Sequence, residues 1–104
     1  MPPVDDAPAP AAMLGALNER RFALLVTMML VDGPLTTTEI ADRLPPRSRG
    51  SLHRDLAALE RVGLLRGDPA TTSRQQGQRV SYQPNRRRII DDFEALVGQL
   101  RDAL

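Results

Sequence analysis

The sequence predicts a mainly α-helical domain with one small β-hairpin, in the order α-α-α-β-β-α. Three observations support this fold class. Apolar residues recur at helical spacing in four segments, capping residues mark the starts of the later helices, and an alternating polar and apolar segment lies before the last helix. A length of 104 residues is sufficient for one domain.

A tail and a long helix are expected at the N-terminus. Residues 1–10 hold four prolines and no periodic apolar pattern, so we expect a disordered tail there and a folded domain over 11–104. A helix is expected from about Ala11 to Val31, before a Gly-Pro pair that cannot continue it. Its second half is apolar nearly all round, which predicts burial on more than one side.

A capping box predicts the second helix. Thr36 and Glu39 have the S/T-x-x-E spacing, and the flanking Leu35 and Ile40 have the spacing of a hydrophobic staple. The helix is expected over 37–44, where a Pro-Pro pair ends it.

The third helix is expected from Arg49 to about Val62, with Ser48 as N-cap and Gly63 after its end. Its apolar residues form one narrow stripe: Leu52, Leu56, Leu59 and Val62. This helix, the preceding turn and the second helix form a helix-turn-helix.

A hairpin and a last helix complete the domain. Strands are expected over 64–66 and 79–83, joined by a long basic tip, and this hairpin makes the helix-turn-helix winged. Asn85 is a good N-cap for a helix over 86–104. The apolar stripe of that helix is Ile89, Ile90, Phe93, Leu96, Val97, Leu100 and Leu104.

The basic residues are concentrated in the middle of the chain. Residues 43–88 hold eleven arginines and three acidic residues, a net charge of +8, whereas 1–42 and 89–104 carry −4 and −3. A basic segment between acidic flanks indicates binding of a polyanion. All fourteen basic residues are arginine, which a GC-rich genome also produces; in either case arginine offers a planar fork for phosphate and guanine.

Composition argues against several other functions. There is no cysteine and only one histidine, so thiolate metal sites and Cys nucleophiles are excluded and a multi-histidine site is not expected. We expect no metal, no cofactor and no catalysis, because the acidic residues are scattered and no glycine-rich phosphate loop is present. Without a signal-peptide pattern or a membrane-length apolar run, the protein is expected in the cytoplasm, at the nucleoid.

Residues 35–83 resemble the winged helix-turn-helix repressors of the bacterial ArsR and MarR type. The matching segments are LTTTEIADRL, SRGSLHRDLAALERVGLLR and QRVSYQ. Two departures stand out. The turn at Pro45-Pro46-Arg47 is one residue longer than usual and lacks the common glycine, and the Cys and His clusters through which many ArsR-type repressors sense metals are missing.

The resemblance implies that the third helix enters the major groove and that the wing contacts phosphate or the minor groove. The DNA-binding residues expected from it are Arg47, Ser48, Arg49, Gly50, Ser51, His53, Arg54, Arg74 and Arg79. A charged helix face that merely meets solvent is the alternative. It is weakened because arginines crowd a helix N-terminus, where the dipole opposes cations. A pH switch or a metal ligand is the alternative for His53, and a disordered polar loop is the alternative for Arg74.

Arginines 86–88 open the last helix, and they either pair with acids such as Asp91 and Asp92 or contact DNA flanks; we favour the ion pairs. The resemblance also implies that the first and last helices (11–32 and 86–104) pair with a second protomer. The predicted dimer interface is Leu14, Leu17, Phe22, Ile90, Phe93, Val97 and Leu100.

These observations predict a homodimeric repressor that binds an inverted repeat in double-stranded DNA; they identify no small-molecule effector and no membrane partner. The alternative is a winged-helix module that binds other proteins in a larger assembly, such as plasmid partition or a transcription complex. The two differ in charge, because an interaction module does not need a net +8 over 43–88.

Overall fold

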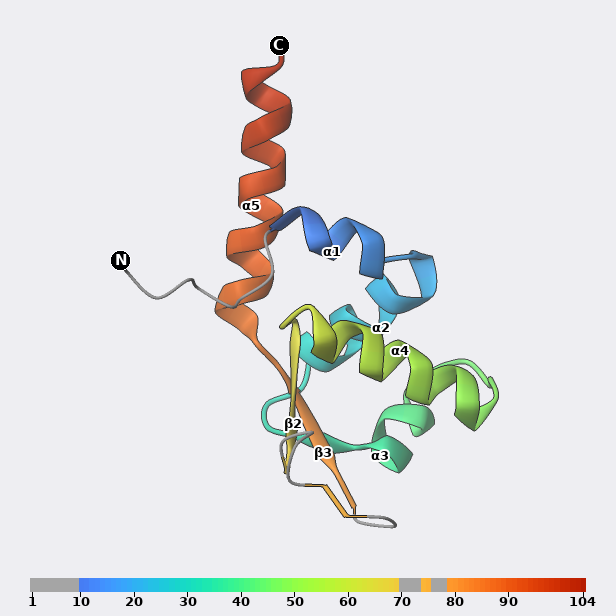
Figure 1. The fold of residues 1–104 in the computed structure, drawn as a ribbon. Helices are drawn as coiled ribbons and strands as arrows, with labels where there is room; N and C mark the ends of the chain where they lie inside the picture. The colour runs from blue at the N-terminus through green and yellow to red at the C-terminus, as the bar shows by residue number, and fades with distance from the viewer. Residues whose placement is uncertain (1–9, 70–73, 76–78) are drawn as a thin grey trace.

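The computed structural model describes residues 10–69, 74–75 and 79–104. These residues form helices and strands in the order α1 Pro10–Ala16, α2 Glu19–Met29, β1 Leu35–Thr36, α3 Thr37–Asp42, α4 Arg49–Arg61, β2 Leu65–Asp68, β3 Ser81–Pro84 and α5 Arg86–Asp102. The strands make an antiparallel sheet of order β1-β3-β2. The helix-turn-helix α3–α4 followed by the β2–β3 hairpin confirms the predicted winged arrangement (Figure 1).

The single long helix predicted at the N-terminus is wrong, because the structure has α1 and α2 in its place. Asn18 interrupts the helix and caps α2: its side chain accepts a hydrogen bond of 2.8 Å from the backbone N–H of Arg21. Asparagine is among the strongest N-cap residues, so the break has a local cause. Pro10 begins α1, where proline is tolerated because no N–H is needed. The rest of the expected disordered tail, residues 1–9, lies outside the described residues.

Strand β1 was not predicted. It is only two residues long and pairs with β3, so that Leu35 lies opposite Tyr82 and Thr36 opposite Ser81. Such a short strand has no periodicity of its own. It joins the start of the helix-turn-helix to the wing.

The predicted caps are confirmed, although some helix ends differ. In the capping box of α3 the N–H of Thr36 donates to Glu39 Oε1 at 2.9 Å, and the N–H of Glu39 donates to Thr36 Oγ1 at 3.3 Å. The side chains of Ser48 and Asn85 cap α4 and α5 by accepting hydrogen bonds from the N–H groups of Ser51 and Arg88. Helix α3 ends two residues before the predicted Leu44.

The core is aliphatic, as expected from the shortage of aromatic residues. Its buried members are Met13, Leu24, Leu25, Met28, Leu35, Ile40, Leu52, Leu56, Leu59, Leu64, Leu65 and Ile89. The apolar segment of α2 is buried on one side only, because Phe22 and Val26 remain 49% and 41% exposed. The sequence predicts that this segment is buried on more than one side, but no described part of the same chain covers its second side.

Helix α5 leaves the body of the molecule, and its C-terminal half projects into solvent (Figure 1). Leu100 is 70% exposed and Leu104, just beyond the helix, is fully exposed. Among the described residues, no helix has the length and hydropathy to cross a membrane.

Candidate nucleic-acid interface

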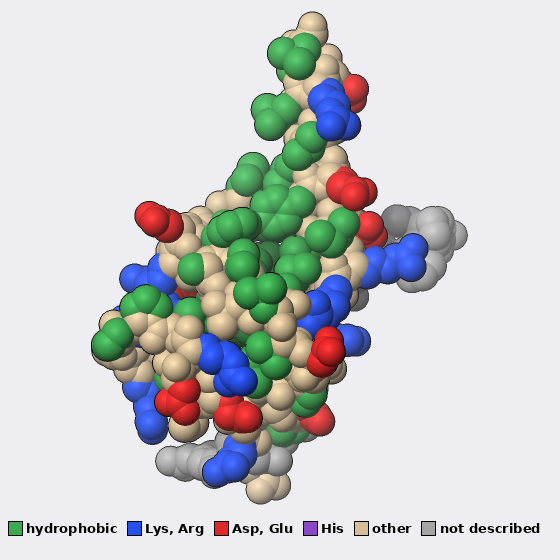
Figure 2. Space-filling model, turned by 180° about the vertical axis from the view of Figure 1, so that it is seen from behind, with side chains coloured by type: hydrophobic (Ala, Val, Ile, Leu, Met, Phe, Trp, Pro, Cys, Tyr) green, Lys and Arg blue, Asp and Glu red, His purple; other side chains and the backbone are tan. Residues whose placement is uncertain are grey.

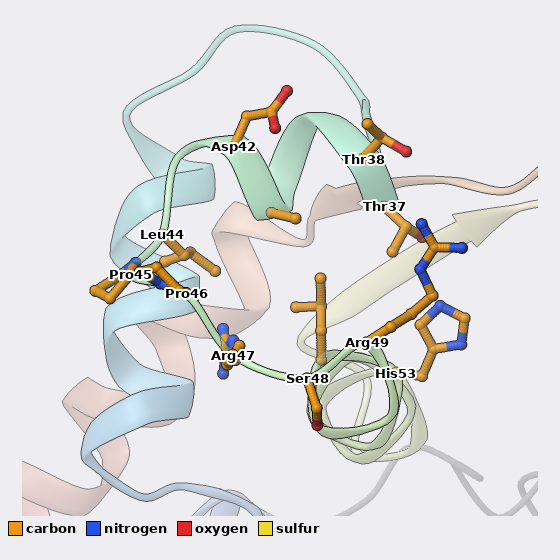
Figure 3. A pocket seen from close by; sticks show the side chains of 12 residues that line it. Thr37, Thr38, Asp42, Leu44, Pro45, Pro46, Arg47, Ser48, Arg49 and His53 are labelled. Carbon is orange, nitrogen blue, oxygen red and sulfur yellow. The ribbon is translucent and has the colours of Figure 1, made fainter.

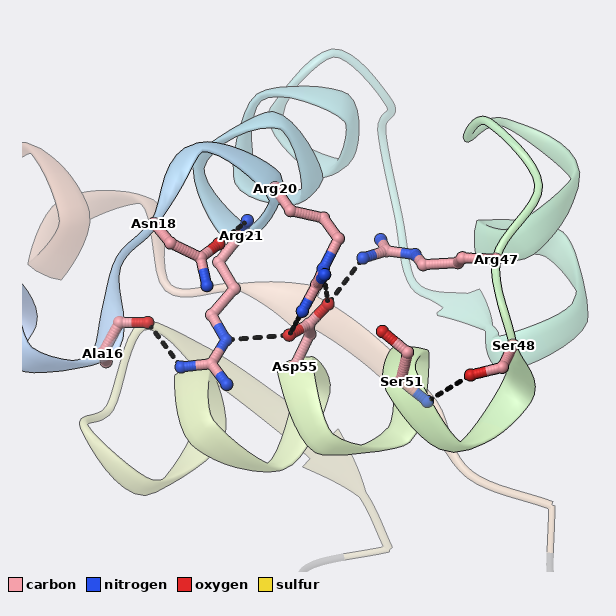
Figure 4. Close-up of polar contacts among 8 residues, drawn as sticks. All are labelled: Ala16, Asn18, Arg20, Arg21, Arg47, Ser48, Ser51 and Asp55. Atoms are coloured by element: carbon pink, nitrogen blue, oxygen red, sulfur yellow. Dashed lines mark hydrogen bonds and ion pairs between the residues drawn. The ribbon is translucent and has the colours of Figure 1, made fainter.

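Helix α4 separates a buried face from an open face. Leu52, Leu56 and Leu59 pack into the core, while the opposite face carries exposed side chains at its N-terminal end. Of the residues predicted on α4, the structure exposes Arg49, Gly50, His53 and Arg54 and leaves Ser51 partly buried. The Ser48 side chain accepts a hydrogen bond of 3.1 Å from the N–H of Ser51 (Figure 4), which fixes the start of the helix.

Two hollows flank this end of α4. The first, of about 410 Å³, lies between α3 and α4 and includes Thr37, Thr38, Arg49 and His53 in its wall (Figure 3). The second, of about 390 Å³, lies between α3 and the hairpin and is lined by the same two threonines, His53 and Arg79, among others. His53 therefore lies at the centre of a surface formed by α3, α4 and the wing, with Arg49 and Arg79 on either side.

The two threonines were missed as candidate site residues. Of the three threonines at the start of α3, only Thr36 caps the helix. The available signal was position: residues in the first turn of the first helix of a helix-turn-helix lie near the DNA backbone. Their hydroxyl groups suit hydrogen bonds to phosphate oxygens.

Arg54 lies on the other flank of α4. It borders a shallow hollow shared with Arg21 and Arg61, on the side toward α1. The structure thus places Arg49 and His53 together and Arg54 apart from them, on the same open helix.

Arg47, which is also predicted to bind DNA, forms an ion pair within the protein. Its guanidinium group donates to Asp55, and its side chain is only 13% exposed (Figure 4). Asp55 is fully buried and also accepts from Arg20 Nε at 2.9 Å and Arg21 Nε at 2.8 Å. Three arginines from α2 and the turn therefore hold one carboxylate of α4.

The surroundings of Asp55 lower its pKa. Burial alone raises the pKa of this carboxyl group, but hydrogen bonds from Arg20 and Arg21 and the charges of Arg20 and Arg47 outweigh it. The pKa therefore lies below its ordinary value. Asp55 stays ionised at neutral pH and supplies the negative charge that the three arginines share.

Arg74, the wing arginine predicted to bind DNA, likewise has partners within the protein. It donates to both carboxylate oxygens of Glu60, at 3.1 and 2.6 Å, and to the carbonyl of Pro69 at 2.9 Å. Its guanidinium carbon lies 5.5 Å from the centre of the Tyr82 ring. These contacts fasten the hairpin to α4, whereas Arg79 is exposed.

The favoured ion pairs at the start of α5 are confirmed for two of the three arginines. Arg88 Nε lies 2.8 Å from Asp92, and the more exposed Arg87 lies 3.8 Å from Asp91. Arg86 instead donates to the carbonyl groups of Met29 and Val31, both at 2.7 Å, just beyond the end of α2.

The residues predicted for the dimer interface form an apolar surface. The exposed ones are Leu14, Phe22, Ile90, Val97 and Leu100, and Leu17 and Phe93 are partly buried. Phe22 and Phe93 pack edge to face, 6.0 Å between ring centres. They line an apolar groove of about 300 Å³ between α2 and α5. Figure 2 shows the hydrophobic side chains continuing from the body along the projecting helix.

Comparisons with known proteins address the fold. No family model and no curated protein matches the sequence. The structure is similar to a crystal structure of an ArsR family transcriptional regulator, with a TM-score of 0.67 and 20% identity over 89% of this chain and 87% of that one. It is also similar to an ArsR-like transcriptional regulator from Rhodococcus sp. RHA1, with a TM-score of 0.63 and 24% identity over 90% and 83% of the two chains. The fold is that of ArsR-family regulators.

The shared fold confirms the resemblance that the helix-turn-helix segments indicated. Within residues 10–69, 74–75 and 79–104, no group of three or more His, Asp or Glu side chains is placed to hold a metal ion. The site residues are thus hydrogen-bonding and cationic groups on an open surface, which suits binding of a polyanion.

Proposed function

We propose that this chain is a sequence-specific DNA-binding regulator that acts as a homodimeric repressor. The observation that carries the proposal is the open face of α4, where Arg49 and His53 face solvent beside the hollows of α3 and the wing, and Arg54 faces solvent on the other flank. The arginines have no acidic partner on this face within the described residues. A bound polyanion supplies that partner.

In the proposed complex α4 lies in the major groove. Arg49 and Arg54 fork to guanine O6 and N7, and His53 contacts a base edge or a phosphate. Thr37 and Thr38 bind phosphate oxygens along one side of the groove, and Arg79 does so from the wing. In this arrangement α4 contacts the bases, whereas α3 and the hairpin contact the DNA backbone and position the protein on it.

The apolar surface of α2 and α5 supports the proposed dimer. Contiguous exposed apolar patches of this kind are rare on monomers and mark association sites. A two-fold dimer presents two α4 helices to one face of the duplex, about 34 Å apart, so the operator is an inverted repeat. Occupation of such a site at a promoter by a cytoplasmic, nucleoid-bound protein excludes the polymerase.

Selection of bound duplexes from a random DNA pool tests the proposal. The expected result is an inverted repeat whose half-sites are centred about one helical turn apart. Arg87→Ala, at an exposed arginine of α5, is the matched control and should select the same sequence. Absence of any enriched sequence with the folded wild-type protein would contradict the proposal.

The exposed apolar surface of α5 also favours a second function, a module that binds other proteins. Gel filtration and salt titration distinguish the two. A monomer whose DNA binding does not depend on salt supports the interaction module, because binding through phosphate contacts weakens steeply with salt.

A further inference from the structure

The apolar residues of α5 repeat at heptad spacing. Ile90, Phe93, Val97, Leu100 and Leu104 are separated by three, four, three and four residues, which is the a/d pattern of a coiled coil. All of them are exposed except Phe93, which is partly buried. The stripe runs from the base of α5 to its projecting end (Figure 2), whereas α1 packs against α5 below the projecting part (Figure 1).

The charges beside this stripe are self-complementary. Glu94 and Arg101 occupy equivalent flanking positions one heptad apart, and both are exposed. Among the described residues neither forms an ion pair. If two copies of α5 run antiparallel, Glu94 of each copy faces Arg101 of the other, so a second copy of this chain satisfies both charges twice.

The same antiparallel register matches the apolar residues. In such a pair an a position of one helix faces a d position of the other. Val97 then meets the partner's Leu100, and Phe93 meets the partner's Leu104. Both apolar contacts and both ion pairs arise in one register, centred between Gly98 and Gln99.

The groove between α2 and α5 receives the projecting end in this arrangement. Phe93 lines the groove together with Phe22, Val26 and Ile90, and the groove volume of about 300 Å³ is sufficient for a leucine side chain. The partner's Leu104 reaches it because α5 extends beyond the body by its C-terminal half (Figure 1). The exposed groove and the exposed helix end thus cover each other reciprocally.

We propose that the C-terminal half of α5 crosses antiparallel onto the partner's α5, with reciprocal Glu94–Arg101 ion pairs and Leu104 in the partner's α2–α5 groove. This inference rests on the proposed homodimer and adds its register and the residues that make the chain recognise a second copy of itself.

A charge-reversal pair tests the register without DNA. Glu94→Arg alone and Arg101→Glu alone each place like charges opposite each other twice, so the dimer dissociation constant should rise at least about tenfold. In an equimolar mixture the two variants form heterodimers in which both ion pairs are restored, one in the original sense and one reversed, and dimerisation should recover. Asp102→Arg, an equal charge change on the opposite face of α5, is the control and should leave the dimer unchanged.

Sedimentation measures the oligomeric state, and circular dichroism verifies that each variant is folded. A wild-type dimer whose two reversed variants do not rescue each other contradicts the register and leaves the proposed function standing. A wild-type monomer at all concentrations contradicts both the register and the proposed homodimer.

Disulfide trapping gives a second measurement. Because the chain has no cysteine, no native thiol can form a competing crosslink. Differently tagged Val97→Cys and Leu100→Cys proteins are mixed and oxidised. The antiparallel register predicts that the crosslinked product is mainly the mixed dimer. Crosslinks within each variant alone indicate a parallel pair and overturn the proposal.

Discussion

Arg47 and Arg49 are two residues apart, yet their guanidinium groups lie in different environments. The Arg47 side chain is only 13% exposed and pairs with the buried Asp55, whereas Arg49 is exposed and forms no ion pair among the described residues. A count of cations over the segment treats the two as equal. The comparison shows that the partner of each arginine decides its role: the inward arginines hold α4 in place, and the outward ones are available to a ligand.

Removal of Asp55, the partner of the inward arginines, should have the largest effect on the free energy of unfolding. Asp55→Ala leaves three arginine side chains around a cavity without their acceptor, so the free energy of unfolding should fall by about 3 kcal/mol. Urea denaturation measures it. Asp91→Ala removes a carboxylate from an exposed pair of α5 and should change stability by less than about 0.5 kcal/mol. Equal effects of the two variants would mean that the buried cluster does not stabilise α4.

Substitution of the two neighbouring arginines should separate stability from binding. Arg49→Ala should weaken binding to the selected DNA by about 1–3 kcal/mol and relax the base preference, because one guanine contact is lost. Arg47→Ala should instead lower stability. Fluorescence anisotropy and urea denaturation of both variants measure the two quantities. A loss of stability in Arg49→Ala with unchanged DNA affinity would reverse the assignment.

The salt dependence of DNA affinity should show how many of the outward arginines contact phosphate. Arg49, Arg54 and Arg79 give six cations per dimer, so log K against log salt should have a slope of about −5. Arg79→Ala should make it shallower by about two units, whereas Arg74→Ala should not, because Arg74 is bound to Glu60. A slope change of the same size in both variants would show that Arg74 leaves Glu60 to contact DNA.

The pH dependence of stability should reflect the ionisation of Asp55 in its cluster with the three arginines. Because the folded pKa of Asp55 lies below its unfolded value, its contribution is fully present above about pH 4 and is lost as the pH falls through the folded pKa. The free energy of unfolding, measured from pH 7 to pH 2, should therefore decrease on acidification. Asp55→Asn should flatten this part of the profile. An unchanged profile would mean that other carboxyl groups cause the acid sensitivity.

The parts of the fold that depend on neighbouring residues could be predicted from the sequence. Thr36, Ser48 and Asn85 cap helices through bonds to the third residue onward, so their spacing is visible in the sequence. Asn18 is a cap of the same kind and was overlooked because the apolar pattern continues through it. The two-residue β1 depends on pairing with a strand more than forty residues away, which no local pattern shows.

The same distinction between local and long-range contacts explains which parts of the candidate site could be predicted. The open face of α4 follows from the positions of its leucines, so Arg49 and His53 could be predicted to face outward. The partners of Arg47 and Arg74 could not be predicted, since Asp55 and Glu60 pair with them only once the chain has folded. Asp55 did carry a signal: it lies three residues after Leu52, on the flank of the apolar stripe, where an acidic residue needs a partner.

Arg86 has a mechanical consequence. Its bonds to the carbonyl groups at the end of α2 tie α5 to α2, and the bonds of Arg20 and Arg21 to Asp55 tie α2 to α4. A displacement of α5 should therefore move α2 and, through it, α4. In the proposed dimer, the α5 contact at the symmetry axis therefore sets the distance between the two α4 helices and, with it, the separation of the half-sites in the proposed operator.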